Sequence, residues 1–150
     1  MTTTTLPDIE SLSFKIELET RVKAPIDVTF AALLEQLGPG FEKSEGESMA
    51  FRLEAWPGGR WFRDLGDGNG HCWGHVQAIK RPTLLEFSGP LMMSHAVANN
   101  VQYRLREENG ETIIKFHHAA FGNIPDDMKK GMVTGWNYII DHARQRAETK

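Results

Sequence analysis

Histidines are the residues of this sequence with the widest chemical range, because imidazole can bind a metal ion or transfer a proton. The 150-residue chain has six of them. His71 and His75 lie four apart in a β-like segment, which separates them by roughly 13 Å, too far for one zinc ion. His117 and His118 are neighbours on another such segment and therefore point to opposite faces. We accordingly predict no metal site and no cofactor.

Nucleophilic catalysis finds equally little support. Cys72 is the only cysteine, and on a strand its neighbour His71 faces the other way, so the two cannot form a thiolate–imidazole pair. The sequence also lacks the GxSxG, GxGxxG and phosphate-loop motifs. We therefore predict no catalytic residues and favour a binding protein over an enzyme.

His118 is the histidine whose environment can be inferred, because it shares the parity of Ile114 and Phe116 in a strand-like segment. This alternation predicts that the His118 ring points into the protein interior. A buried imidazole needs a hydrogen-bond partner. That partner is either another part of the fold, which we favour, or the polar end of a ligand.

Aromatic and methionine side chains supply material for an apolar binding site. The chain has four tryptophans and eight phenylalanines, and such residues line small-molecule pockets as well as ordinary cores. Arg63 shares the parity of Trp61 and could meet a carboxylate or phosphate at a pocket mouth. The residues that we predict to contact a ligand are Trp61, Arg63, Trp73, Phe87, Met92, Tyr103, Phe116, His118, Met132, Trp136 and Ile140.

The elements that must position these residues begin with a long strand. Leu12 to Val22 alternates apolar and polar residues, which predicts a strand with one dry face. A helix from Pro25 to Leu37 and a second short helix or irregular stretch from Phe41 to Ser48 are expected next. Gly66 to Gly70 and Asn109-Gly110 are hairpin signals within the later β-like series. That series comprises Met49–Trp56, Arg60–Leu65, His71–Ile79, Leu84–Ser88, Val97–Arg106 and Glu111–Ala120.

The last element is a long amphipathic helix from Pro125 to about Ala147. Its apolar stripe consists of Met128, Met132, Trp136, Ile139, Ile140 and Ala143. The sheet and this helix each have one dry face, so they must pack against each other. A curved sheet around a single helix leaves space between them, and we predict an internal cavity there.

Several short features follow in a fixed order: Ala24-Pro25 entering the first helix, Gly58-Gly59 before a strand, Gly74-His75-Val76 in the next, Arg81-Pro82, a strand pair ending at His118, and Gly135-Trp136 in the last helix. In order and spacing they resemble the SRPBCC superfamily, the helix-grip fold of START and pollen-allergen-like ligand carriers. Within it, the chain is most similar to the group related to the C-terminal domain of the activator of the heat-shock-protein-90 ATPase.

The resemblance implies an α+β helix-grip fold. Its curved antiparallel sheet of about seven strands would surround a long C-terminal helix, with one or two short helices after the first strand. The family implies an internal pocket but no single activity. Two alternatives to simple binding therefore stay open. One is a small enzyme that uses His118 with Tyr103, for example in cyclisation or hydration, and the other is a module that contacts a chaperone.

The net charge and the lengths of the apolar stretches limit the kinds of partner that the chain can bind. The formal net charge of -3 gives no general attraction for nucleic acid, and no stretch approaches the roughly 20 apolar residues that insert into a membrane. We expect residues 1–10 to be a disordered tail, residues 11–148 to form one domain, and the location to be cytoplasmic. The expected partner is a small apolar or amphipathic molecule, and a homodimer stays open.

Overall fold

In the part of the chain that the structure describes, one antiparallel sheet is accompanied by two α-helices. A computed structural model describes residues 8–42, 48–92 and 94–150. Strand β1 (Ser13–Val22) follows a 3-10 turn at Glu10–Leu12, and helix α1 (Ile26–Leu37) follows β1. The remaining elements are β2 (Phe51–Leu53), β3 (Arg60–Gly66), β4 (Asn69–Lys80), β5 (Leu84–Gly89), β6 (Val97–Glu108), β7 (Glu111–Gly122) and α2 (Asp126–Glu148).

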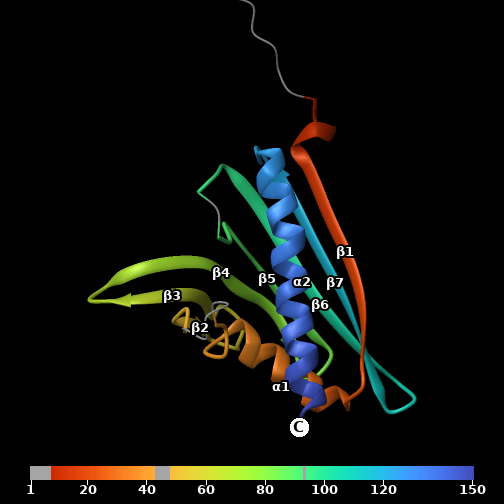
Figure 1. The fold of residues 1–150 in the computed structure, drawn as a ribbon. Coiled ribbons are helices and arrows are strands. Elements are labelled where there is room, and N and C mark those ends of the chain that lie inside the picture. The colour runs from red at the N-terminus through yellow and green to blue at the C-terminus, as the bar shows by residue number, and fades with distance from the viewer. Residues whose placement is uncertain (1–7, 43–47, 93) are drawn as a thin grey trace, which may run out of the picture.

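The sheet wraps around the last helix. Its strand order is β1-β7-β6-β5-β4-β3-β2, so the first strand pairs with the last and the rest form a meander. Helix α2 runs along the face of β6, β7 and β1, while α1 crosses near its C-terminal end and the β3–β4 hairpin extends away from it (Figure 1). The predicted α+β helix-grip fold, with a long C-terminal helix, is confirmed.

The strands β3 to β7 extend one or two residues beyond their predicted ranges, and two other predicted strands are shorter in the structure. Leu12 belongs to the 3-10 turn, so β1 begins at Ser13. The predicted strand Met49–Trp56 shortens to β2, since Ala50 has a positive φ of 55° that interrupts the extended backbone before it. The short helix considered for residues 41–48 falls mostly on residues 43–47, which lie outside the described part of the chain.

Both predicted hairpin turns are present. Asp67 and Gly68 have φ of 55° and 77°, and Asn109 and Gly110 have φ of 55° and 79°. Two consecutive positive φ values characterise the type I′ turn, whose twist matches that of the flanking strands. Asn109-Gly110 thereby fixes the register of β6 on β7, including the pair of Tyr103 with Phe116.

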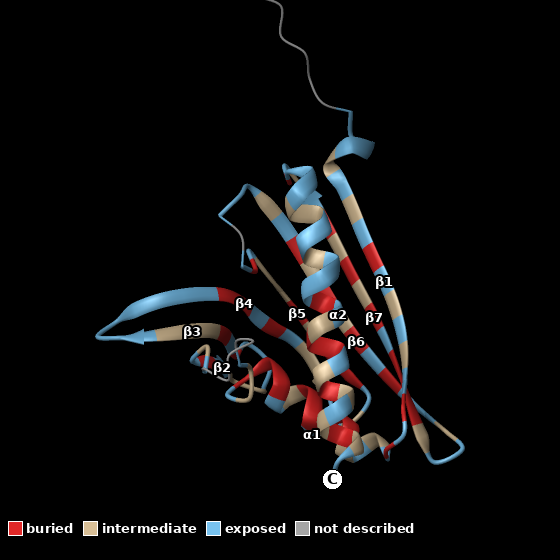
Figure 2. Ribbon diagram, in the orientation of Figure 1, coloured by how far each residue is buried: buried red, intermediate tan, exposed pale blue. Residues whose placement is uncertain are grey.

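The two halves of α2 differ in burial. In the C-terminal half Ile139, Ile140 and Ala143 are buried, as are Leu33 and Leu37 of α1. In the N-terminal half (residues 126–135) no residue is buried, and Trp136 is the first that is. Figure 2 shows this change along the helix. The C-terminal half of α2 is therefore anchored in the core, whereas its N-terminal half is loosely covered, meaning that its side chains are at most partly buried.

Two glycines in the loosely covered half lead to a prediction. A Cβ built on Gly131 or Gly135 would meet nothing within 4 Å outside the helix's own backbone. We expect Gly131→Ala and Gly135→Ala each to raise the free energy of unfolding by about 0.5–1 kcal/mol, the helix-propensity difference between the two residues. Urea unfolding measures it. A loss of stability in either variant would mean that this side of α2 is closely packed.

Candidate functional site

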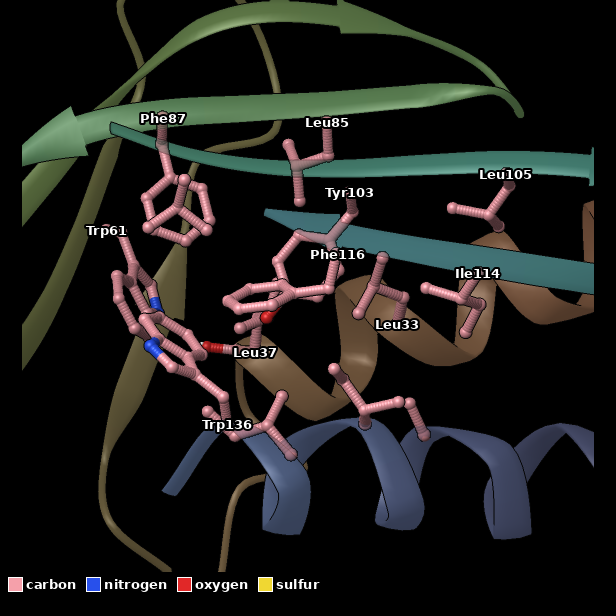
Figure 3. Close-up of a cluster of buried hydrophobic side chains, with 14 of the residues drawn as sticks. Leu33, Leu37, Trp61, Leu85, Phe87, Tyr103, Leu105, Ile114, Phe116 and Trp136 are labelled. Atoms are coloured by element: carbon pink, nitrogen blue, oxygen red, sulfur yellow. Dashed lines mark hydrogen bonds between the residues drawn. The ribbon is translucent and has the colours of Figure 1, made fainter. Parts of the chain in front are cut away.

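An aromatic cluster fills the middle of the space between the sheet and α2. It comprises Trp61 (β3), Trp73 (β4), Phe87 (β5), Tyr103 (β6), Phe116 (β7) and Trp136 (α2). Ring centroids lie 4.9 Å apart for Phe116 and Trp136, 5.0 Å for Tyr103 and Phe116, and 6.5 Å for Tyr103 and Trp136. Figure 3 shows the rings of Trp61, Phe87, Tyr103, Phe116 and Trp136 gathered above α2, with Leu33 and Leu37 of α1 beside them. The alternation of each strand aims its ring at the helix.

His118 lies at the centre of a buried hydrogen-bond network. The Trp136 indole N–H donates to its Nδ1 at 3.0 Å, and its Nε2 lies 2.8 Å from Oδ1 of Asn99. Because Nδ1 accepts, Nε2 carries the proton and donates to Asn99. The Asn99 amide in turn donates to the Gly89 carbonyl at 3.0 Å. The network joins α2 to β7, β6 and β5 and fixes the tautomer of His118.

The environment of His118 keeps its ring uncharged. The side chain is fully buried. Burial, with a smaller contribution from the neighbouring His117, lowers the pKa of His118 from 6.5 to about 4. With both nitrogens occupied, the ring has no free lone pair to serve as a base in this state. The inward orientation predicted for His118 is thus found, with a partner supplied by the fold.

Tyr103 differs from His118 because its hydroxyl has no partner. The residue is fully buried, and among the described residues no hydrogen bond to its OH is formed. Burial raises the pKa of the Tyr103 phenol well above its usual value, so the group is a neutral donor and acceptor. An unpaired buried hydroxyl is unfavourable, and in native proteins it marks a place where a ligand or water can add a partner.

The predicted site residues fall into three groups. The buried ones on the inner side are Trp61, Trp73, Phe87, Tyr103, Phe116, His118, Trp136 and Ile140. Arg63 and Met132 are half-buried. Met92 is 47% exposed in the segment after β5, where its neighbour Leu91 is buried instead.

Asn99 is the site residue that sequence reasoning missed. It shares the parity of Val101 and Tyr103, which was the available signal, but asparagine is usually exposed. Here the fold satisfies both ends of its amide, so burial is tolerated.

Arg63 lies away from the His118 network. It pairs across the sheet with Phe51 of β2 and His71 of β4. Its Nε is buried without a hydrogen-bond partner among the described residues. Arg63 therefore belongs to the β2–β3–β4 end of the sheet rather than to the space under α2.

Two surface hollows lie at that same end. Their volumes are about 530 and 540 Å³, and both are lined by Arg52, Arg60, Phe62 and Asp64. Arg63 also lines the first hollow, whereas four other charged residues there are already paired. Nε and Nη2 of Arg60 donate to the two carboxylate oxygens of Glu54 at 2.7 and 3.0 Å, and these hydrogen bonds lower the pKa of Glu54 to about 2. Nη2 of Arg52 lies 3.4 Å from Oδ2 of Asp64. Arg52, Glu54, Arg60 and Asp64 therefore present no unpaired charge to a ligand in the hollows.

The family model described as "Activator of Hsp90 ATPase homolog 1-like protein" matches residues 23–148, from the start of α1 to the end of α2. The chain belongs to this family. A search of curated proteins finds no match.

Solved structures show the same fold as this member of the Hsp90 ATPase activator homolog 1-like family. A protein from Rhizobium leguminosarum has a TM-score of 0.69 at 20% identity, covering 92% of this chain and 96% of its own. An AHSA1-like protein from Aeromonas hydrophila has a TM-score of 0.64 at 18% identity, with 91% and 93% covered. CalU16 from Micromonospora echinospora has a TM-score of 0.58 at 19% identity, with 90% and 84% covered.

Membership of the Hsp90 ATPase activator homolog 1-like family suggests a module that binds a ligand or acts on a chaperone. Within the described residues, no three His, Cys, Asp or Glu side chains are grouped so that they could hold a metal ion. No helix of the described ranges is long and apolar enough to cross a membrane. What this family member offers chemically is an apolar, aromatic interior with neutral hydrogen-bonding groups.

Proposed function

We propose that this chain binds a small, mostly apolar molecule between the N-terminal half of α2 and the sheet, without catalysing a reaction. The observation that carries the proposal is that no residue of α2 before Trp136 is buried. At 1.5 Å per residue this half is roughly 15 Å long, enough to cover a small ligand. A helix half whose side chains are at most partly buried can move away from a sheet at a lower cost in free energy than a fully buried one.

The surfaces that face each other across this region are apolar. Lys129 Nζ lies 5.9 Å from the Phe14 ring, which puts the start of α2 over β1. Trp136 is bonded to His118 of β7 at the other end. Met128, next to Lys129, and Met132, between these two points, are only partly buried against the core. Methionine adapts to ligands of different shape, which suits a site closed by a movable helix.

Binding is tested with N-phenyl-1-naphthylamine, an uncharged fluorescent probe. We expect saturable binding by the wild type, because the probe can exchange solvent contact for the apolar faces of α2 and the sheet. Met132→Trp should weaken it by about tenfold or more, since the larger ring takes the ligand's place.

Thr134→Trp is the matched control, because Thr134 is exposed on the same half of α2. It should leave the affinity unchanged. Absence of saturable binding, or equal weakening by both variants, would rule out the proposed location.

Contact with a chaperone is the second candidate. It is favoured by the family match and by Trp56, which is 57% exposed at the rim of one surface hollow. Exposed aromatic side chains of this kind are frequent in protein interfaces. A change in the ATPase rate of an Hsp90-class chaperone on addition of the chain would support this candidate over the first.

A further inference from the structure

Arg63 has a buried Nε, but it lies at the β2–β3–β4 end of the sheet, away from the His118 network. The polar residues that are buried as a whole in the described part of the chain are all uncharged. Besides Tyr103 they are Thr29, Gln36, Asn99, Thr112 and His118, and none is an Asp, Glu, Lys or Arg. His118 is held neutral by its bonds to Trp136 and Asn99. A carboxylate, phosphate or ammonium brought into this interior would find no counter-ion, and burying an unpaired charge is strongly unfavourable.

Lys129 carries a positive charge in the first turns of α2. Its Nζ lies over the Phe14 ring at 5.9 Å and 3.8 Å from Asp126. This ammonium is at the outer end of α2, and Asp126 already offsets its charge. It could meet the head group of an acid that remains at the surface, but not one that enters the aromatic cluster.

The unpartnered hydroxyl of Tyr103 supplies the second observation. Its ring centroid lies 6.5 Å from that of Trp136, the residue at which the loosely covered half of α2 ends. In the register of β6 on β7, Tyr103 lies two residues beyond Val101, the partner of His118, so a ligand under that half reaches the Tyr103 hydroxyl when the Trp136 ring moves aside. Figure 3 shows the Tyr103 side chain reaching away from the sheet into the space shared with Leu37 and Trp136. A hydrogen-bonding atom on the ligand would satisfy the hydroxyl.

From these observations we propose that the ligand is an uncharged molecule with an apolar body and one carbonyl, ether or hydroxyl oxygen that hydrogen-bonds to Tyr103. The inference rests on the binding function proposed above. In this proposal the Tyr103 hydroxyl selects the polar group of the ligand by hydrogen bonding, and the aromatic cluster selects the apolar body of the ligand by packing.

Three compounds that share the naphthalene ring system test the inference: naphthalene, 2-acetylnaphthalene and 2-naphthoate, each competing with N-phenyl-1-naphthylamine at pH 7.5. We expect 2-acetylnaphthalene to bind about threefold to tenfold more tightly than naphthalene, the gain of one hydrogen bond. The charged 2-naphthoate should bind more weakly than both. Tyr103→Phe should abolish the preference for 2-acetylnaphthalene while naphthalene binding persists.

Tyr138→Phe is the control. Tyr138 is the only other tyrosine of the sequence, and its hydroxyl donates to the Glu42 carbonyl at 3.1 Å on the surface. This variant should keep the preference. Tyr103→Phe should also retain full stability in urea unfolding, since its hydroxyl has no partner to lose. Tightest binding by 2-naphthoate, or a preference that survives Tyr103→Phe, would overturn the inference and leave the proposed function intact. If none of the four compounds binds, the proposed function itself fails.

Discussion

Replacement of Trp136 by alanine is expected to lower the free energy of unfolding by about 3–5 kcal/mol, the usual cost of deleting a buried tryptophan ring. The ring is 4% exposed and contacts Phe116 and His118. The substitution removes these contacts and leaves Nδ1 of His118 without its donor. Urea unfolding followed by circular dichroism measures the loss.

Two further variants separate the contributions of Trp136. Trp136→Phe keeps a ring but loses the N–H, so it should cost about 1–3 kcal/mol for the unpaired nitrogen of His118. Trp56→Ala removes a tryptophan that is 57% exposed and should change stability by less than about 1 kcal/mol. Equal effects of Trp136→Ala and Trp56→Ala would show that Trp136 is not part of the core.

Acidification is expected to destabilise the fold through His118. The pKa of His118 is 6.5 in the unfolded chain and about 4 in the folded protein. Above pH 6.5 the ring is neutral in both states and the full stability is present. As the pH falls from 6.5 to 4 the unfolded chain binds a proton that the folded protein excludes, so stability declines. The total loss is about 3 kcal/mol at 1.36 kcal/mol per pKa unit.

The measurement is the free energy of unfolding against pH, together with an NMR titration of the histidine rings. His117→Gln is the control, because His117 lies on the outer face, 3.4 Å from Glu17, and makes only the smaller contribution to the lowered pKa of His118, so most of the decline should remain. His118→Gln should reduce the slope between pH 6.5 and 4. A His118 ring that titrates near pH 6.5 in the folded wild type would contradict the buried network.

Much of the fold could be predicted from the sequence because its elements carry strong local patterns. The alternation before Val22 predicts β1, and Asn109-Gly110 predicts the hairpin that sets Tyr103 opposite Phe116. The apolar stripe of α2 predicts which side of the helix meets the sheet. These features need no long-range information, since each is fixed by neighbours in the chain.

The site was less predictable because it depends on how side chains from distant strands fit together. Parity placed His118 inward but could not name Trp136 and Asn99 as its partners. Leu91 has a positive φ of 58°, so no strand-like alternation could tell which of Leu91 and Met92 is buried. Nor does an apolar stripe reveal that burial in α2 begins only at Trp136. Gly131 and Gly135, which disfavour a helix interior, were the one local hint.

The location of a bound ligand tests the account most directly. A crystal of the protein grown with 6-bromo-2-acetylnaphthalene would reveal the bromine by its anomalous scattering. The account predicts a peak between the N-terminal half of α2 and β7, near Met132, with the ketone oxygen directed at Tyr103. A peak in the hollows beside Arg60 and Phe62, or an empty interior at a concentration that saturates the probe in solution, would contradict it.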